Sequence, residues 1–266
     1  MPAMRRVHWS EIHRVWAQYT PPLRPNAEVV AEMHSQIGAP SGHTLLLGVT
    51  PELADIVADV VAIDKNAAMV GNLWPGNTDR RRVIIGDWLN TNFAAGAFDC
   101  CVGDGSLNAV GYPDQMHLLC SEVARVLRGG GKIVLRVFIR PDAVEKMEAV
   151  HQSTISGKIQ NFHGFKWRLA MAIAGQSNQP NIEMGWVFDA FNQMFPDRDR
   201  LVSLTGWLRE EIDTIEFLKH SVAISSFPTR NQLLSVVSHT FSNVRIVPVG
   251  TYEMAELCPL LVAERA

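Results

Sequence analysis

The chain has 266 residues, and 47% of them are hydrophobic, which is enough for one large α/β domain or for a domain with an appendage. Its 24 basic and 27 acidic side chains leave a net charge of −3, which argues against a protein that binds nucleic acid or an anionic membrane surface. No apolar stretch reaches about 18 residues, so we expect no membrane span.

The N-terminal part of the chain predicts two helices ahead of the first strand. Residues 8–18 have the spacing of a short amphipathic helix, and a proline-rich extended connector follows over 19–25. Asn26 is placed to cap a second helix that ends near Gly38. These helices either only pack on the sheet or also close a ligand site with their aromatic side chains, Trp9, Trp16 and Tyr19.

The stretch 43–64 predicts a strand, a tight turn, a short helix and a second strand. An apolar run is followed by Gly48, and then Thr50 and the proline after it form a helix-start pattern. A second apolar run ends on Asp64. Ligands of doubly wound sheets bind outside the carboxyl ends of the strands, so Asp64 is placed to accept hydrogen bonds from ribose hydroxyls.

A second acidic residue ends the next predicted strand in the same way. This strand covers residues 82–85, and Asp87 and Trp88 follow it. A carboxylate beside an aromatic ring suits an adenine, because the acid can accept from the exocyclic amine and the indole can stack on the ring. The alternative is a turn-forming aspartate next to a tryptophan that only packs.

The fourth and fifth predicted strands cover residues 98–102 and 132–138, with a helix over 113–127 between them. A run of glycines at 129–131 is expected to stop that helix. The fourth strand ends in small polar residues that let a ligand approach the backbone closely, among them Gly103, Asp104 and Ser106.

The strand–helix alternation stops after the fifth strand and resumes near residue 229, so residues 140–228 are interpreted as a helical insertion. Thr229 is expected to cap a helix over 230–241, and two late strands over 244–249 and 259–263 are expected to pair antiparallel. The helices expected in the insertion cover 142–154, 159–174, 183–194 and 203–220.

The four cysteines have no CxxC or other metal-type spacing, so we expect buried reduced thiols and no metal site. The N-terminus lacks the apolar core of a signal peptide, which together with the thiols predicts a cytoplasmic protein. The cysteines are Cys100, Cys101, Cys120 and Cys258.

These segments resemble the class I S-adenosylmethionine-dependent methyltransferases. The resemblance is clearest in FDCCVGDGSLNAVGYPDQMHLLCSEVARVLRGGGKIVLRVF, which is similar to the family's fourth strand, its next helix with an E-x-x-R-V-L segment, and its fifth strand. A second similar piece is TRNQLLSVVSHTFSNVRIVPV. The resemblance implies a doubly wound, seven-stranded mixed α/β sheet, mostly parallel, with a C-terminal antiparallel hairpin.

The domain organisation follows from the resemblance. Residues 1–42 form N-terminal helices that pack on or cap the site, and 140–228 form an insertion between strands five and six that acts as a substrate lid. The S-adenosylmethionine-binding methyltransferase domain is expected to cover 43–139 and 229–266.

The chain departs from the family in its first motif. The family usually has D/E-x-G-x-G-x-G after strand one, and here only Gly48 remains, while the usual acid is replaced by an apolar residue. One close backbone approach and a helix start can serve the single carboxylate of the methionyl group. The alternative is a non-catalytic S-adenosylmethionine-binding or interaction protein. A nicotinamide-dependent oxidoreductase is disfavoured by the missing G-x-G-x-x-G.

Carried over by position, the resemblance implies cofactor-binding roles for ten residues of this chain. The methionyl end would be lined by Gly48, Val49 and Thr50. The ribose would meet Asp64, with Lys65 beside it, and the adenine would meet Asp87 and Trp88. Nearest the sulfonium and the acceptor would lie Gly103, Asp104 and Ser106.

The implied reaction is transfer of a methyl group from S-adenosylmethionine to a small-molecule acceptor, which requires positioning and exclusion of water. An oxygen acceptor would need a general base, for which the candidates are Asp104, His8 and His163. We expect a monomer or a homodimer without nucleic-acid or membrane partners.

The insertion's aromatic residues either form its core or suit an apolar, planar acceptor; they are Phe162, Phe165, Trp167, Trp186, Phe188, Phe191 and Phe195.

Overall fold

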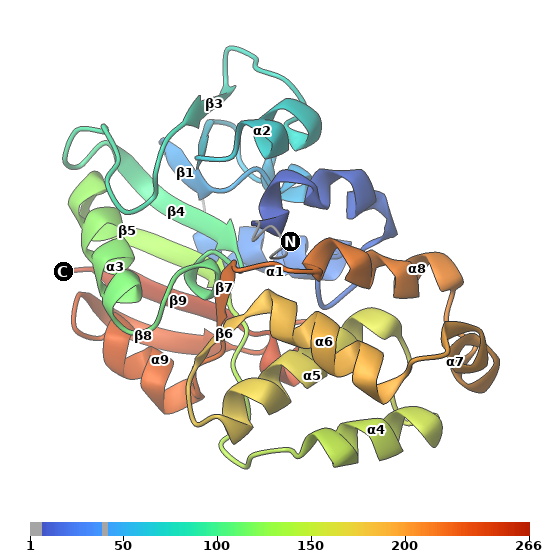
Figure 1. Cartoon of the computed structure of the whole chain (residues 1–266). Coiled ribbons are helices and arrows are strands. Elements are labelled where there is room, and N and C mark those ends of the chain that lie inside the picture. The colour runs from blue at the N-terminus through green and yellow to red at the C-terminus, as the bar shows by residue number, and fades with distance from the viewer. Residues whose placement is uncertain (1–6, 39–41) are drawn as a thin grey trace.

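The computed structural model describes residues 7–38 and 42–266. Its main sheet consists of the strands Thr44–Leu47 (β1), Val60–Asp64 (β2), Arg81–Ile85 (β3), Phe98–Asp104 (β4), Leu127–Arg136 (β5), Phe241–Val247 (β8) and Leu260–Arg265 (β9). The strand order is β3-β2-β1-β4-β5-β9-β8 (Figure 1). Strand β9 lies between β5 and β8 and runs antiparallel to both. The predicted seven-stranded mixed sheet with a C-terminal antiparallel hairpin is therefore confirmed.

The register of this sheet brings the predicted site residues to one edge. Leu47 at the end of β1 pairs with Ile63 on one side and with Gly103 on the other. Asp64 pairs in turn with Ile85, the last residue of β3. Because parallel strands end on the same side, the residues that follow these positions meet where the strand order reverses.

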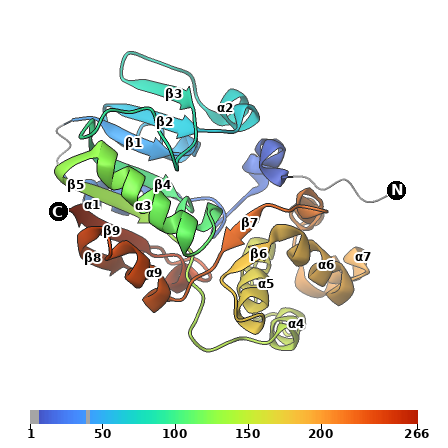
Figure 2. The same ribbon diagram turned by 60° about the vertical axis from the view of Figure 1, so that its left-hand side comes forward.

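Helices cover both faces of the sheet, and each face has its own apolar cluster. The helices Asp114–Val126 (α3) and Arg230–Val237 (α9) lie on one face, and Ala27–Ile37 (α1) lies on the other (Figure 2). Along β1, Leu45 belongs to the first cluster and Leu46 to the second, as the alternation of side chains in a strand requires.

The predicted helix caps are largely confirmed. Asn26 Oδ1 accepts a hydrogen bond from the Val29 amide at 3.0 Å at the start of α1, and Gly38 follows its last residue. Thr229 and Gln232 form a capping box at the start of α9. These signals depend on residues three positions apart, so the sequence alone predicts them.

Several predicted elements of the first half differ from the structure. Residues 8–18 form two 3₁₀ helices, His8–Ser10 (η1) and Ile12–Gln18 (η2), rather than one α-helix. The helix predicted after Gly48 is a single 3₁₀ turn, Pro51–Leu53 (η3), and the Thr50 side chain makes no cap hydrogen bond. The link between β1 and β2 is short and has to lead back along the full length of the strands. A 3₁₀ helix rises further per residue than an α-helix, so it spans this distance with fewer residues.

The glycine run predicted to stop α3 lies inside β5. Gly131 packs so closely that an added Cβ would lie 2.9 Å from the Arg128 carbonyl oxygen. The pairing of β4 with β5 shifts its register between Phe98 and Cys100, which accommodates these glycines.

The insertion is helical, as predicted, but its second half is more divided. Gly206, in a left-handed conformation at φ 72°, ends one helix, so the single helix predicted over 203–220 is wrong. Two short strands that the sequence did not predict, Asn181–Glu183 (β6) and Ile224–Ser226 (β7), pair antiparallel. The helices are Met147–Ile155 (α4), Phe162–Gln176 (α5), Met184–Met194 (α6), Arg198–Thr205 (α7), Arg209–Asp213 (α8) and the 3₁₀ helix Thr214–Leu218 (η5).

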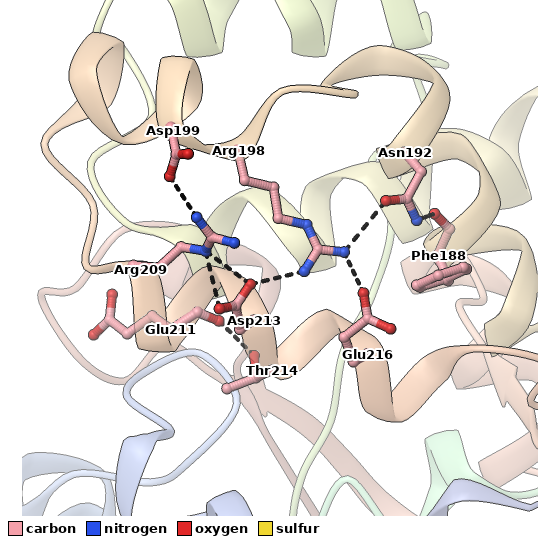
Figure 3. Close-up of polar contacts among 9 residues, drawn as sticks. All are labelled: Phe188, Asn192, Arg198, Asp199, Arg209, Glu211, Asp213, Thr214 and Glu216. Atoms are coloured by element: carbon pink, nitrogen blue, oxygen red, sulfur yellow. Dashed lines mark hydrogen bonds and ion pairs between the residues drawn. The ribbon is translucent and has the colours of Figure 1, made fainter.

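A polar network ties the outer helices of the insertion together (Figure 3). Arg198 donates to Asp213 at 2.7 Å and to Asn192 at 3.3 Å, and it also pairs with Glu216. Arg209 donates to the same Asp213 carboxylate. The two guanidinium groups therefore hold α6, α7, α8 and η5 in one arrangement around the apolar helix α5.

Candidate functional site

A cavity of about 270 Å³ opens at the carboxyl ends of β1, β2 and β4, where the strand order reverses. One wall consists of the strand ends and the turns after them, a second of η1, η2 and the connector after them, and a third of the insertion. The cavity is therefore built from all three segments predicted from the sequence. All predicted cofactor positions except Gly103 and Ser106 line it.

Gly48 and Trp88 meet at the strand-end wall. The Gly48 amide donates to the Ile63 carbonyl oxygen at 2.9 Å, and Trp88 Nε1 donates to the same oxygen at 2.6 Å. Gly48 adopts φ +100°, and a Cβ added to it would lie 3.6 Å from Trp88 and 3.9 Å from Asp64. The side chains of Asp64 and Trp88, predicted from two separate strand ends, thus both lie beside the turn at Gly48.

One acidic group of this wall, Asp64, leaves a carboxylate oxygen available to a ligand. Asp64 Oδ1 accepts from the Asn66 amide at 2.7 Å, whereas its Oδ2 has no hydrogen-bond partner in the described part of the chain. Burial raises the pKa of Asp64, while the Asn66 amide and Lys65 oppose this rise. Lys65 Nζ lies 3.8 Å from Asp87. The arrangement can accept hydrogen bonds from neighbouring hydroxyl and amine groups.

Asp104 lines the cavity but is committed to a partner. Both of its oxygens accept from Arg136, at 2.5 Å from Nε and at 3.0 Å from the terminal nitrogen. The two side chains are 4% and 0% exposed. Burial raises the pKa of Asp104, and Arg136 opposes this effect. The ion pair orients the carboxylate and occupies both of its oxygens, which disfavours Asp104 as a general base.

The two small residues predicted beside Asp104 lie behind the cavity wall. Ser106 is 1% exposed and folds over Gly103, where an added Cβ would be 2.5 Å from its hydroxyl. The missing Cβ at Gly103 thus makes room for the Ser106 side chain. This packing depends on a turn that the sequence pattern did not specify.

The two candidate histidines occupy different environments. His8 lines the cavity, and its Nδ1 lies 2.7 Å from Ser221 Oγ. His163 is fully buried and does not line the cavity, and its Nε2 donates to the Gln18 carbonyl oxygen at 2.9 Å. Burial and the charge of Lys166 lower the pKa of His163 to about 3, so its ring is neutral near pH 7. Only His8 is placed to contact a ligand.

The N-terminal aromatic residues both pack and face the cavity. Trp9, Trp16 and Tyr19 line it, and the same three side chains contact the apolar cluster beneath β1 and β2. Packing on the sheet is therefore confirmed for these side chains, and their contact with a ligand stays a prediction.

Of the seven aromatic residues singled out in the insertion, only Trp167 lines the cavity. Trp186 is 43% exposed, and the others belong to or pack on the insertion's core. The core reading is therefore confirmed for Phe162, Phe165, Phe188, Phe191 and Phe195.

The sequence reasoning missed Lys166. It is 1% exposed, lines the cavity, and has its Nζ 4.6 Å from the centroid of the Tyr19 ring. Burial lowers the pKa of Lys166 to about 7. A signal was available, because Lys166 stands between two aromatic residues, Phe165 and Trp167, of helix α5.

The remaining expectations concern cysteines, metals and membranes. All four cysteines are buried free thiols. Within residues 7–38 and 42–266, no group of three or more His, Cys, Asp or Glu side chains is arranged to hold a metal ion. None of the helices in these ranges combines the length and apolar character needed to cross a membrane.

Comparison with known proteins identifies the domain. Residues 46–135 match the family model described as "Methyltransferase domain". No curated protein matches the sequence. These 90 residues include the end of β1, all of β2, β3, β4 and α3, and most of β5, and hence the strand-end wall of the cavity.

Solved structures show the same fold at low identity. A Rhodobacter sphaeroides protein provisionally named among the Zn-dependent alcohol dehydrogenases is 13% identical, with a TM-score of 0.61 over 99% of this chain and 100% of its own. A SAM-dependent methyltransferase from Methanosarcina mazei is 15% identical, with a TM-score of 0.51 over 91% and 99%. PigF, solved with SAH, is 12% identical, with a TM-score of 0.51 over 97% and 59%.

At these identities the structural likeness shows the fold alone, and the assignment as a methyltransferase domain comes from the family model that matches residues 46–135. Residues 46–135 thus form a methyltransferase domain, with S-adenosylmethionine as its cofactor, in agreement with the predicted resemblance.

Proposed function

We propose that this S-adenosylmethionine-dependent methyltransferase acts on a small-molecule acceptor held between the strand ends and the insertion. The observation that carries the proposal is one cavity with two different ends. Acidic side chains and a glycine turn line the end formed by the strands, and mainly apolar side chains, together with Lys166, line the end formed by the insertion. A cavity covered by two other segments of the chain suits a small acceptor better than a macromolecule.

The strand-end wall fits the cofactor. Asp64, whose Oδ2 is free, would accept from the ribose hydroxyls, and Asp87 and Trp88 would contact the adenine. The turn at Gly48, together with Val49 and Thr50, would lie along the methionyl group, because a glycine at φ +100° places no side chain there.

The other two walls would bind and orient the acceptor. Phe138, Trp167, Met184 and Leu218 present apolar surface to the cavity from β5's end and from the insertion. The N-terminal segment and residues 140–228 would act as cap and lid, so that water is excluded and acceptor and methyl are held in line. The bound cofactor supplies an electrophilic methyl group, so the chain's residues mainly have to position the acceptor.

Calorimetric titration with S-adenosylmethionine and S-adenosylhomocysteine tests the cofactor step. We expect both to bind, and the absence of binding at millimolar concentration would contradict the proposal. The acceptor class is tested by incubating the protein and labelled S-adenosylmethionine with a cell extract separated into small-molecule and macromolecular fractions. Label that depends on the protein should enter the small-molecule fraction, and label found only on protein or nucleic acid would contradict it.

A further inference from the structure

Lys166 is a buried amine that lines the cavity from helix α5. Its side chain is 1% exposed, and the neighbouring residue of α5, Trp167, lines the cavity with it. The other cation of this helix, Arg168, is paired with Glu145, whereas Lys166 is buried without a carboxylate beside it.

In the described part of the chain, the only partners of the amine are two aromatic rings. Its Nζ lies 4.6 Å from the ring centroid of Tyr19 and 5.8 Å from that of Phe162, and it forms no ion pair or hydrogen bond. Among the ionisable groups near it, His163 is neutral at pH 7 and burial raises the pKa of Tyr19. The carboxylates Asp64, Asp87 and Asp104 line the same cavity, but none of them pairs with it.

A buried charge without a hydrogen-bonded or charged partner is costly, and a ligand that supplies such a partner would remove this cost. Two further donors point to the same ligand chemistry. Trp16 and Trp167 line the cavity, and the indole N–H of each is buried without a hydrogen-bond acceptor. Three donors that make no hydrogen bond to a protein acceptor among the described residues favour a ligand that supplies oxygen atoms.

We infer that the methyl acceptor is an apolar, aromatic organic acid and that Lys166 binds its anionic oxygen. This inference rests on the proposed function, since it assigns the acceptor class of that same site. The apolar walls accept the ring system, and the ammonium group of Lys166 selects for a carboxylate or an ionised hydroxyl. Lys166 is thus the specificity-determining residue at the acceptor end.

Binding of such an anion has a proton signature. Burial lowers the pKa of Lys166 to about 7, so most of the amine is neutral at pH 8 in the free protein. A carboxylate that binds beside it stabilises the ammonium form, and the protein therefore takes up a proton from the buffer. An acidic hydroxyl can instead give its own proton to the amine, so that no net uptake occurs.

The test uses 2-naphthoate, 2-naphthol and neutral 2-naphthamide as probes against the full chain saturated with S-adenosylhomocysteine. Calorimetry at pH 8 in two buffers of different ionisation enthalpy measures affinity and proton uptake together. We expect naphthoate or naphthol to bind about tenfold or more tightly than naphthamide. Proton uptake with naphthoate marks the carboxylate as the preferred group, and preference for naphthol without uptake marks the hydroxyl.

Two variants complete the design. Lys166→Met should remove the preference for the acidic probe while leaving affinity for S-adenosylhomocysteine unchanged. Lys158→Met changes an exposed lysine of the same insertion and should alter neither. Equal or absent binding of all three probes, or a preference that survives in Lys166→Met, would overturn the inference. Failure of S-adenosylhomocysteine to bind would instead overturn the proposed function, so the two failures are distinguishable.

Discussion

Gly48 and Trp88 share one hydrogen-bond acceptor, the carbonyl oxygen of Ile63 at the end of β2. The amide comes from the turn after β1, and the indole comes from the loop after β3. A single carbonyl group therefore links the ends of three neighbouring strands. The wall proposed to bind the cofactor is pre-organised by this contact, which makes its geometry sensitive to the backbone at Gly48.

Replacing Gly48 by alanine should weaken both folding and cofactor binding. The backbone at φ +100° is one that residues with a Cβ rarely adopt, so we expect a loss of about 1–3 kcal/mol in the free energy of unfolding. Urea unfolding and titration with S-adenosylhomocysteine measure the two effects. Gly129→Ala is a matched control, because an added Cβ there meets nothing within 4 Å. Equal behaviour of the two variants would contradict the role of this turn.

Asp64→Asn should lower the affinity for S-adenosylhomocysteine by about 10- to 100-fold, as expected when a charged hydrogen-bond acceptor is lost. Asp79→Asn changes an exposed acid and should have no effect. Because burial raises the pKa of Asp64, wild-type affinity should fall on acidification at a higher pH than an ordinary aspartate would require. Calorimetry between pH 4 and 7 checks this, and an affinity independent of pH and of Asp64 would exclude the assigned role.

Arg136→Met should destabilise the protein by roughly 3–5 kcal/mol, because it leaves the buried Asp104 carboxylate without a partner. The double variant Arg136→Met, Asp104→Leu should recover much of this loss, since two apolar side chains can replace a buried ion pair. Unfolding in urea of the four members of the cycle gives the coupling energy. Additive losses would show that the two side chains do not act as a pair.

Lys166→Met should stabilise the fold, and the gain should depend on pH. The pKa of Lys166 is lowered from 10.5 to about 7 on folding, so between these values the unfolded chain binds a proton that the folded chain releases. Wild-type stability therefore rises with pH in this window relative to the variant. The advantage of Lys166→Met, on the order of a few kcal/mol, should be largest below pH 7 and vanish near pH 10.5. Unfolding measurements at pH 6 and pH 10 test this, with Lys158→Met as the control; a wild type more stable than Lys166→Met at pH 6 would show that the buried amine carries no such cost.

The sequence by itself determined the features that depend on neighbouring residues. Apolar runs followed by Gly48, Asp64 and Asp87 located the strand ends, and the caps at Asn26 and Thr229 located two helices. Each of these signals is read within a few positions, because strand alternation and helix capping involve adjacent turns of the chain. Once the strands are parallel, their ends have to meet at one edge.

Only the tertiary structure decided which polar groups are paired and which face the cavity. Asp104 meets Arg136 because two strands far apart in the sequence pair in one particular register, and this contact occupies a carboxylate that the sequence left free. Lys166 becomes a cavity residue only because the connector at Tyr19 packs over α5 and excludes water. Burial and pairing arise from contacts between distant segments, so no local pattern of residues encodes them.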